Sequence, residues 1–262
     1  MTATSPYELA IQRLSEAAAT RQPCAPVRDL LGPSDIDGAY AVQSAVTAQR
    51  IAAGERVIGY KVGLTSPAVQ RQFGVSQPDF GTVFAAGCYG SGEPISLTSL
   101  LQPRIEAEVA FVLGRDINEP NASIADLVRA IDFAIAAVEV VDSRIADWDI
   151  TITDTVADNA SSGAVVLGTV PISLRGLDLA GIGMVIETDG DQVSVGMGAA
   201  CMGSPLIAAA WLVREMSRRG HTLPAGSLIL SGALGPMVTV DGTGCYTARL
   251  DGVGEVEAVF AQ

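Results

Sequence analysis

The sequence predicts an α+β protein, with helices at the N-terminal end and mainly strands in the rest of the chain. Two observations predict this class. Before residue 55, apolar residues recur with the spacing of an amphipathic helix. Beyond that point, short apolar runs alternate with glycine-containing turns, which is typical of strands. We therefore expect one domain over residues 1–262, with a mainly helical portion at 1–55 and a β-rich core at 56–262.

The first expected elements are two helices, over residues 7–21 and 34–53. Both have apolar residues at helical spacing. Ser34 is the expected N-cap of the second helix and Gly54 its stop, because these residue types favour those positions. A connector over residues 25–33 joins the two.

The β-rich core is expected to contain strands, three short or medium helices and a turn-rich loop. The expected strands are residues 57–64, 104–114, 133–141, 184–187, 192–195, 227–230, 237–240, 245–250 and 256–260. The expected helices begin at Ser66-Pro67 and close at Gly74, run from Ser123 to Arg129, and run from Ser204-Pro205 to Gly220. The loop is residues 77–81, where glycine and proline favour turns.

The composition excludes several classes of function. The chain has 29 acidic and 16 basic residues, and this formal net charge of −13 disfavours nucleic acid and anionic membranes as partners. No apolar run approaches the roughly 20 residues of a membrane span, and the N-terminus lacks a signal-peptide pattern. The four cysteines are scattered without a CxxC pair, so neither a zinc site nor a disulfide framework is indicated. We expect a cytoplasmic protein.

Two carboxylates one residue apart interrupt the apolar strand 104–114. Because side chains alternate faces along a strand, Glu106 and Glu108 point to one side and their apolar neighbours to the other. Two ionised carboxylates on a core strand repel each other unless a proton or a cation offsets the repulsion. A solvated outer face also carries alternating acids, and this alternative stays open.

A third acid, Glu139, lies in the apolar run 133–141. If it meets Glu106 and Glu108, the site has three oxygen donors. Carboxylates without a nearby histidine or cysteine suit a hard divalent ion, Mg²⁺ or Mn²⁺, better than zinc. The sequence therefore predicts a metal site made of these three glutamates.

Two further ionisable residues are candidates. Lys61 is the only charge inside its strand and lies between Gly59 and Gly63, which would let the backbone approach whatever the ammonium contacts. A lysine in a partly apolar site can titrate nearer neutrality. The alternative is an edge-strand lysine that prevents aggregation. Asp79 follows a proline, and on sequence alone it is a turn residue.

Other patterns carry less information. The small polar residues at 155–163 can bind a carboxylate or form turns, and the turn is favoured. The run 196–201 lacks the third glycine of a dinucleotide loop, and no GxSxG or Walker motif occurs. His221 is the only histidine and has no acid beside it, so we expect it in a surface loop.

Five motifs occur together in the chain. They are GYKVGLT at 59–65, QPDFG at 77–81, QPRIEAE at 102–108, ADNAS at 157–161 and GALGP at 232–236. As a set they resemble the 2-oxopent-4-enoate (2-hydroxypenta-2,4-dienoate) hydratases of aromatic meta-cleavage pathways. These belong with 4-oxalocrotonate decarboxylases in the fumarylacetoacetate hydrolase superfamily. The match covers nearly the whole chain, and it implies a mixed β-sandwich roll or barrel core with an N-terminal helical segment.

The resemblance also implies roles for individual residues. It implies that the single domain is catalytic, that Glu106, Glu108 and Glu139 hold a divalent ion, and that the substrate is a small 2-oxo acid. It places Lys61 and Asp79 in the active site as catalytic residues. The residues that it places near the substrate are Leu64, Asn159, Ser161, Ser162 and Leu234. It further implies a homo-oligomer, in close relatives a decamer built from pentamers.

The implied activity is hydration of 2-hydroxypenta-2,4-dienoate, or a close homologue, to 4-hydroxy-2-oxopentanoate. Decarboxylation of 4-oxalocrotonate (2-oxo-3-hexenedioate) is the first alternative, because it needs the same ion and electron sink. Acylpyruvate hydrolases use a His-Glu pair to activate water, and His221 has no such partner in the sequence. The last alternative is a non-catalytic scaffold subunit, against which the retained Lys61 and the three acids argue.

Overall fold

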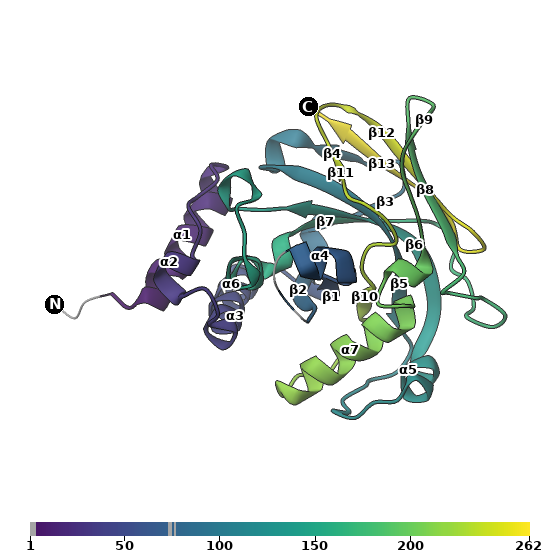
Figure 1. Cartoon of the computed structure of the whole chain (residues 1–262), viewed down its shortest axis with the longest axis horizontal. Coiled ribbons are helices and arrows are strands. Elements are labelled where there is room, and N and C mark those ends of the chain that lie inside the picture. The colour runs from purple at the N-terminus through teal and green to yellow at the C-terminus, as the bar shows by residue number, and fades with distance from the viewer. Residues whose placement is uncertain (1–3, 73–74, 76) are drawn as a thin grey trace.

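The protein has two β-sheets, with helices at its N-terminal end and against the larger sheet (Figure 1). The computed structural model describes residues 4–72, 75 and 77–262. The helices are α1 (Pro6–Thr20), α2 (Arg28–Leu31), α3 (Ile36–Ala52), α4 (Pro67–Gln72), α5 (Ile124–Ala130), α6 (Ile152–Ala157) and α7 (Pro205–Arg218). The strands are β1 (Val57–Gly63), β2 (Asp79–Phe84), β3 (Cys88–Gly90), β4 (Pro94–Ser96), β5 (Pro103–Leu113), β6 (Ile131–Asp142), β7 (Ser162–Leu167), β8 (Gly183–Thr188), β9 (Asp191–Met197), β10 (Leu228–Leu230), β11 (Val238–Thr239), β12 (Gly244–Leu250) and β13 (Gly254–Ala261).

The larger sheet is rolled up. Its strand order is β2-β1-β10-β5-β6-β7-β3, and β11 pairs with the start of β5. Lys61 on β1 forms an ion pair with Glu139 on β6, 3.2 Å between Nζ and Oε1, although β10 and β5 lie between these strands. Neighbouring strands are about 4.8 Å apart, so a flat sheet would separate β1 from β6 by about 14 Å. The face that carries Lys61 and Glu139 is therefore the inside of the roll.

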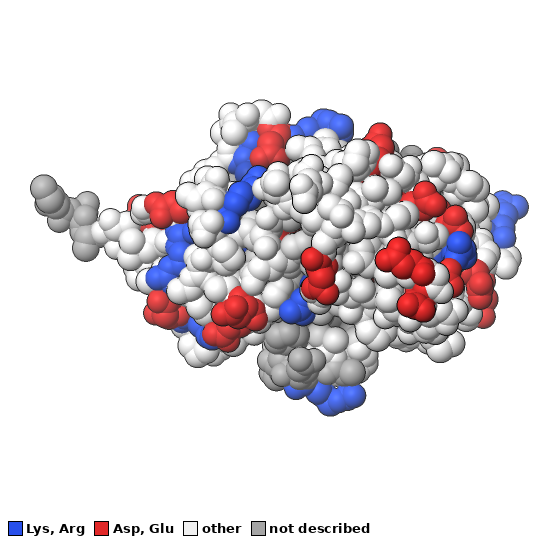
Figure 2. Space-filling model, turned by 90° about the horizontal axis from the view of Figure 1, so that it is seen from above, with Lys and Arg blue, Asp and Glu red and all other residues white. Residues whose placement is uncertain are grey.

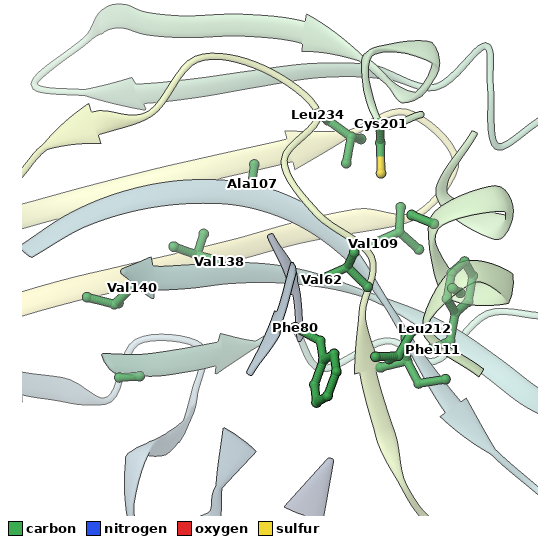
Figure 3. Packing of buried hydrophobic residues seen from close by; sticks show 14 of the residues in the cluster. Val62, Phe80, Ala107, Val109, Phe111, Val138, Val140, Cys201, Leu212 and Leu234 are labelled. Atoms are coloured by element: carbon green, nitrogen blue, oxygen red, sulfur yellow. The ribbon is translucent and has the colours of Figure 1, made fainter. Parts of the chain in front are cut away.

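The other face of β5 faces the main hydrophobic core. Ile105, Ala107 and Val109 are all buried there, as the alternation along the strand predicts. Figure 3 shows Val109 and Ala107 close to Val62 and Leu234, which come from distant parts of the chain and belong to the same core. The smaller sheet, in the order β4-β13-β12-β8-β9, contributes the other side of this core. The rigid packing of β5 from outside the roll fixes its inward-facing side chains.

The structure corrects several element boundaries. Asp35 caps α3 in place of Ser34, because its side chain accepts a hydrogen bond from Gly38 N at 3.0 Å. The expected connector contains the short helix α2, and the helix α6 is not predicted from the sequence at all. The loop expected at residues 77–81 is mostly strand, since β2 begins at Asp79. Gly74, the expected end of the α4 helix, lies outside the described residues.

The molecular surface carries mixed charge. Acidic side chains are scattered over the face seen in Figure 2, with basic side chains between them. No helix within the described ranges is both long enough and apolar enough to pass through a bilayer.

Asp154 ties the N-terminal helices to the core. Its carboxylate is completely buried and accepts hydrogen bonds from the backbone N–H groups of Val27 and Arg28, both at 2.9 Å. The same carboxylate accepts from the Arg28 guanidinium at 2.7 Å and from Thr151 N at 2.9 Å. One side chain on α6 therefore holds the start of α2 and the start of its own helix.

Replacing Asp154 by asparagine should destabilise the protein by about 2–4 kcal/mol, because an amide cannot accept all of these charge-assisted hydrogen bonds. Urea denaturation of the variant and the wild type measures the difference. Asp149→Asn is the matched control, since Asp149 pairs with the same arginine but its side chain is 65% exposed; its cost should stay below about 0.5 kcal/mol. Equal losses in the two variants would show that Asp154 has no special anchoring role.

Candidate functional site

Three carboxyl groups meet inside the roll. The antiparallel register of β5 and β6 pairs Glu106 directly with Glu139, and Glu108 lies one pleat along on the same face of β5. One carboxylate oxygen from each of the three residues lies within 4.8 Å of those of the other two. Glu108 and Glu139 are fully buried and Glu106 is partly exposed. The structure thus brings together the three predicted residues, on the inner face rather than on a solvated outer face.

The cluster is electrostatically unfavourable by itself. Burial, followed by repulsion from Glu139, raises the pKa of Glu106 to about 7. The pKa of Glu108 is raised well above its usual value by burial and by Glu139 and Glu106. Glu108 Oε2 accepts a hydrogen bond from Gly232 N at 2.8 Å, but Glu108 Oε1 and Glu139 Oε2 have no hydrogen-bond partner among the described residues. Oxygen donors that are buried, close together and unsatisfied fit a hard divalent cation.

Lys61 supplies the positive charge nearest to this cluster. It is buried on β1, between β2 and β10, so it is not an edge-strand lysine. Its Nζ lies 3.2 Å from Glu139 Oε1 and donates a hydrogen bond to Ala160 O at 2.9 Å. Burial acts to lower the pKa of Lys61, but the surrounding carboxylates outweigh it and raise the pKa above its usual value. The expectation that Lys61 titrates nearer neutrality is wrong, because the sequence alone does not show how many acids surround it.

Asp79 lies next to Lys61 at the start of β2. Its partner across the strand pair is Gly63, where a Cβ atom would lie 2.1 Å from Asp79 Oδ1, so only glycine leaves room for this carboxyl group. Asp79 Oδ2 accepts a hydrogen bond from Thr155 Oγ1 at 3.1 Å, and Oδ1 has no hydrogen-bond partner among the described residues. Burial raises the pKa of Asp79, and Lys61 opposes that shift. Thr155 belongs to the small polar run 155–163 that can bind a carboxylate, but the sequence indicates neither the helix α6 that carries it nor its contact with Asp79.

A left-handed turn places the carbonyl that Lys61 contacts. Asn159, Ala160 and Ser161 have φ angles of 55°, 50° and 54°, which non-glycine residues rarely adopt in succession. The Asn159 side chain pins this turn to β2, with Oδ1 accepting from Thr82 N at 2.7 Å and Nδ2 donating to Thr82 O at 2.9 Å. Both polar atoms of this amide bind the backbone and hold the turn, and the second N–H of Nδ2 has no hydrogen-bond partner among the described residues.

The other residues expected near the substrate differ in what they offer. Ser161 is buried and its hydroxyl has no hydrogen-bond partner among the described residues, so it can still bind a ligand. Ser162 begins β7, partly exposed, and its carbonyl accepts from Arg144 Nη1 at 2.8 Å. Leu64 follows β1 with a φ of 55°, and Leu234 is fully buried with its N–H donating to Ala107 O at 3.1 Å. Ser161 is thus the one whose free hydroxyl is buried, whereas Ser162 is partly exposed.

Features outside the cluster do not compete with it as a site. Two surface hollows of about 480 Å³ lie along α1 and beside α5, away from the buried acids. His221 is exposed just after α7, as the sequence predicts. Of the cysteines, Cys201 is buried and Cys245 is exposed, and all four are free.

Comparison with known proteins identifies the family. Residues 58–261 match the model of the fumarylacetoacetate (FAA) hydrolase C-terminal region. The chain belongs to the fumarylacetoacetate hydrolase family. The α+β fold with N-terminal helices that the sequence predicts is the fold of this family, and that prediction is confirmed.

Within the fumarylacetoacetate hydrolase family, the chain is similar to hydratases and to a decarboxylase. It is 53% identical over 250 residues to a 2-keto-4-pentenoate hydratase of Burkholderia vietnamiensis, which covers 95% of each sequence. It is 51% identical over 259 residues to the TodF product hydratase of Pseudomonas putida, covering 99% of this chain and 97% of the relative. The solved structure of 4-oxalocrotonate decarboxylase from Pseudomonas putida G7, complexed with magnesium and adipate, has a TM-score of 0.92 at 32% identity and covers 98% of this chain and 97% of that chain.

Replacing Glu108 by glutamine should raise the melting temperature in EDTA, because one buried negative charge is removed while the bond from Gly232 N is kept. The expected gain is about 2–4 °C per kcal/mol of relieved repulsion. Added Mn²⁺ should stabilise the wild type and have little effect on the variant. Thermal melts with and without Mn²⁺ measure both effects, and Glu257→Gln, which changes an exposed acid on β13, is the control. A variant that melts lower in EDTA and still responds to Mn²⁺ would contradict this arrangement.

Proposed function

We propose that this protein is a metal-dependent hydratase that converts 2-hydroxypenta-2,4-dienoate, or a close homologue, to 4-hydroxy-2-oxopentanoate. The observation that carries the proposal is the buried group of three carboxylates beside Lys61 and Asp79. Identities of 53% and 51% to hydratases over nearly the whole chain support the same reaction, against 32% to the decarboxylase.

Glu106, Glu108 and Glu139 would hold the divalent ion, Mg²⁺ or Mn²⁺, through oxygen donors alone. When bound, such an ion acts as a Lewis acid that withdraws electron density from a 2-oxo acid. Magnesium in the related decarboxylase structure supports a divalent ion of this kind. Because Glu108 and Glu139 are fully buried, the protein excludes water from the inner side of the site.

The reaction also requires two protons to be placed on carbon. Ketonisation of the dienol moves its hydroxyl proton to C5, and hydration then adds hydroxide at C4 and a proton at C3. Asp79 is suited to carry these protons, since burial raises its pKa and its Oδ1 is free of hydrogen bonds among the described residues. Lys61 keeps its ammonium charged among the carboxylates and can stabilise negative charge on the reacting molecule. Ser161 has a free hydroxyl that can orient the substrate.

Decarboxylation of 4-oxalocrotonate is the second candidate function. The TM-score of 0.92 to a decarboxylase complexed with adipate favours it, because the two proteins share the fold over almost their whole lengths. The hydrolase alternative has weaker support, since His221 is exposed beyond the end of α7. The scaffold alternative predicts no turnover at all by the metal-loaded protein.

Purified protein loaded with Mn²⁺ should hydrate 2-hydroxypenta-2,4-dienoate and release no carbon dioxide from 4-oxalocrotonate. Replacing Lys61 by methionine should lower kcat by about 10²–10⁴-fold, because the ammonium beside Glu139 is lost while the side-chain length is kept. Absorbance of the dienol and carbon dioxide release measure the two activities. Carbon dioxide release without hydration would reverse the ranking of the two functions, and no activity on either substrate would favour the scaffold.

We also propose that the protein assembles as a homo-oligomer. Strand β9 is at the edge of the smaller sheet, and Val193, Val195 and Met197 alternate along it with their side chains exposed. Natural proteins protect edge strands, so an apolar edge of this length supports contact with another subunit. The decamer implied by the family resemblance is one assembly that would cover it.

Replacing Val195, which is 60% exposed, by lysine should shift the protein to a smaller assembly, because a charge would be buried at the edge of β9. Size-exclusion chromatography with light scattering measures the mass. Val170→Lys is the matched control, since Val170 is 59% exposed but lies outside the strands. A monomeric wild type would overturn the homo-oligomer, and a V195K variant of unchanged mass would exclude the β9 edge as its contact.

A further inference from the structure

Arg104 lies on the same face of β5 as the carboxylate cluster. Alternation along the strand places Arg104 with Glu106 and Glu108, while Ile105 between them is fully buried in the core on the other face. Its cross-strand partner on β6 is Val141, two residues after Glu139. Arg104 is therefore one row, about 7 Å along the strand, from the Glu106–Glu139 pair.

Exposure along this face shows the direction from which solvent reaches the cluster. Glu108 and Glu139 are fully buried, Glu106 is partly exposed, and Arg104 is partly exposed as well. The accessible end of the cluster is thus the end at Glu106, on the side of Arg104. A ligand that enters along β5 meets the arginine before the buried acids.

The guanidinium of Arg104 has no acidic partner. No carboxylate within the described ranges forms an ion pair with it, and its Cζ lies over the ring of Trp148, 4.4 Å from the ring centroid. Burial alone lowers the pKa of Arg104, which is consistent with a guanidinium that lacks a compensating acid. Stacking on an aromatic ring leaves the N–H edge of a guanidinium free to donate to an anion.

The loop that supplies the indole is held in an unfavourable backbone conformation. Asp147 and Trp148 have φ angles of 59° and 56°. Gln102 fixes them: its Oε1 accepts from Asp147 N at 2.8 Å and its carbonyl accepts from Trp148 Nε1 at 3.2 Å. The Gln102 amide in turn donates to Ser143 O and Ile145 O, at 3.0 and 2.8 Å. Strain of this kind persists where the surroundings impose it, often at ligand sites.

We infer that Arg104, supported by Trp148, binds the carboxylate of the incoming 2-oxo acid at the entrance to the roll. Arginine matches a carboxylate with two parallel N–H donors. The need for such a residue follows from charge, since a chain of net charge −13 repels an anionic substrate at long range. This inference rests on the proposed function only in taking a 2-oxo acid as the ligand.

The kinetic test compares Arg104→Met with Arg104→Lys. R104M should lower kcat/KM by at least about tenfold, because the charge-assisted contact with the substrate carboxylate is lost, and leave kcat within about twofold. The salt dependence of kcat/KM should weaken in R104M. R104K keeps the charge but not the two parallel donors, so it should recover the salt dependence and only part of kcat/KM. Arg175→Met is the control. Arg175 is exposed on a loop, and its replacement by methionine removes the same positive charge. Thermal melts check that each variant is folded.

A binding test does not depend on turnover. Trp148 and Trp211 are the two tryptophans, so in a Trp211→Phe background the fluorescence reports on Trp148. Titration with oxalate in the presence of Mg²⁺ should change this fluorescence, with about tenfold weaker binding in R104M than in the parent. Oxalate serves as the probe because it presents the same paired oxygens as a 2-oxo acid.

The outcomes separate this inference from the proposed function. Unchanged kcat/KM and unchanged oxalate binding in R104M would overturn the inference while leaving the hydratase intact. A fall in kcat with no change in kcat/KM or in oxalate binding would also overturn it, since Arg104 would then act after capture. Oxalate binding that depends on Arg104 in a protein without hydratase activity would support the inference and refute the proposed function.

Discussion

The site depends on the burial of three carboxyl groups against one ammonium group. Lys61 forms an ion pair with Glu139, but Glu106 and Glu108 have no such partner within the described chain. Burying like charges together opposes folding, as the raised pKa values of the acids show. The main core, packed against the other face of β5, must offset this repulsion. A bound divalent cation would remove most of it, so affinity for metal and instability without metal have the same origin.

The backbone around the cluster is shaped by close approaches that side chains would block. At Gly63 a Cβ would meet Asp79, and at Gly81 a Cβ would lie 2.2 Å from Asn159 O. These glycines let β1, β2 and the left-handed turn at 159–161 approach each other inside the roll. The turn itself costs roughly 1–2 kcal/mol for each left-handed residue. In this conformation the Ala160 carbonyl points at Lys61 and accepts a hydrogen bond from it, which fixes the position of the ammonium group.

The sequence predicts the parts of this site that depend on local periodicity. Alternation along β5 is enough to place Glu106 and Glu108 on one face. Local periodicity does not show which distant segments of the chain pair with each other. Asp79 follows a proline and so resembles a turn residue, yet its place in β2 depends on pairing with β1. The direction of the shift in the Lys61 pKa depends on acids contributed by three other strands. The contact of Thr155 with Asp79 depends on α6, a helix of only six residues that has no clear pattern in the sequence.

The cluster alone does not separate hydration from decarboxylation, since both reactions need electrons withdrawn from the same 2-oxo group. They differ in what happens at the carbon chain: hydration needs a water and two carbon protonations, whereas decarboxylation leaves a dienolate that takes its proton on oxygen and needs a path for carbon dioxide. We therefore expect the distinction to reside in the groups that hold protons. Thr155 fixes one oxygen of Asp79 and leaves the other free, and the turn that contacts Lys61 ends at the free hydroxyl of Ser161. Selectivity would then come from α6 and the turn that follows it, rather than from the three glutamates.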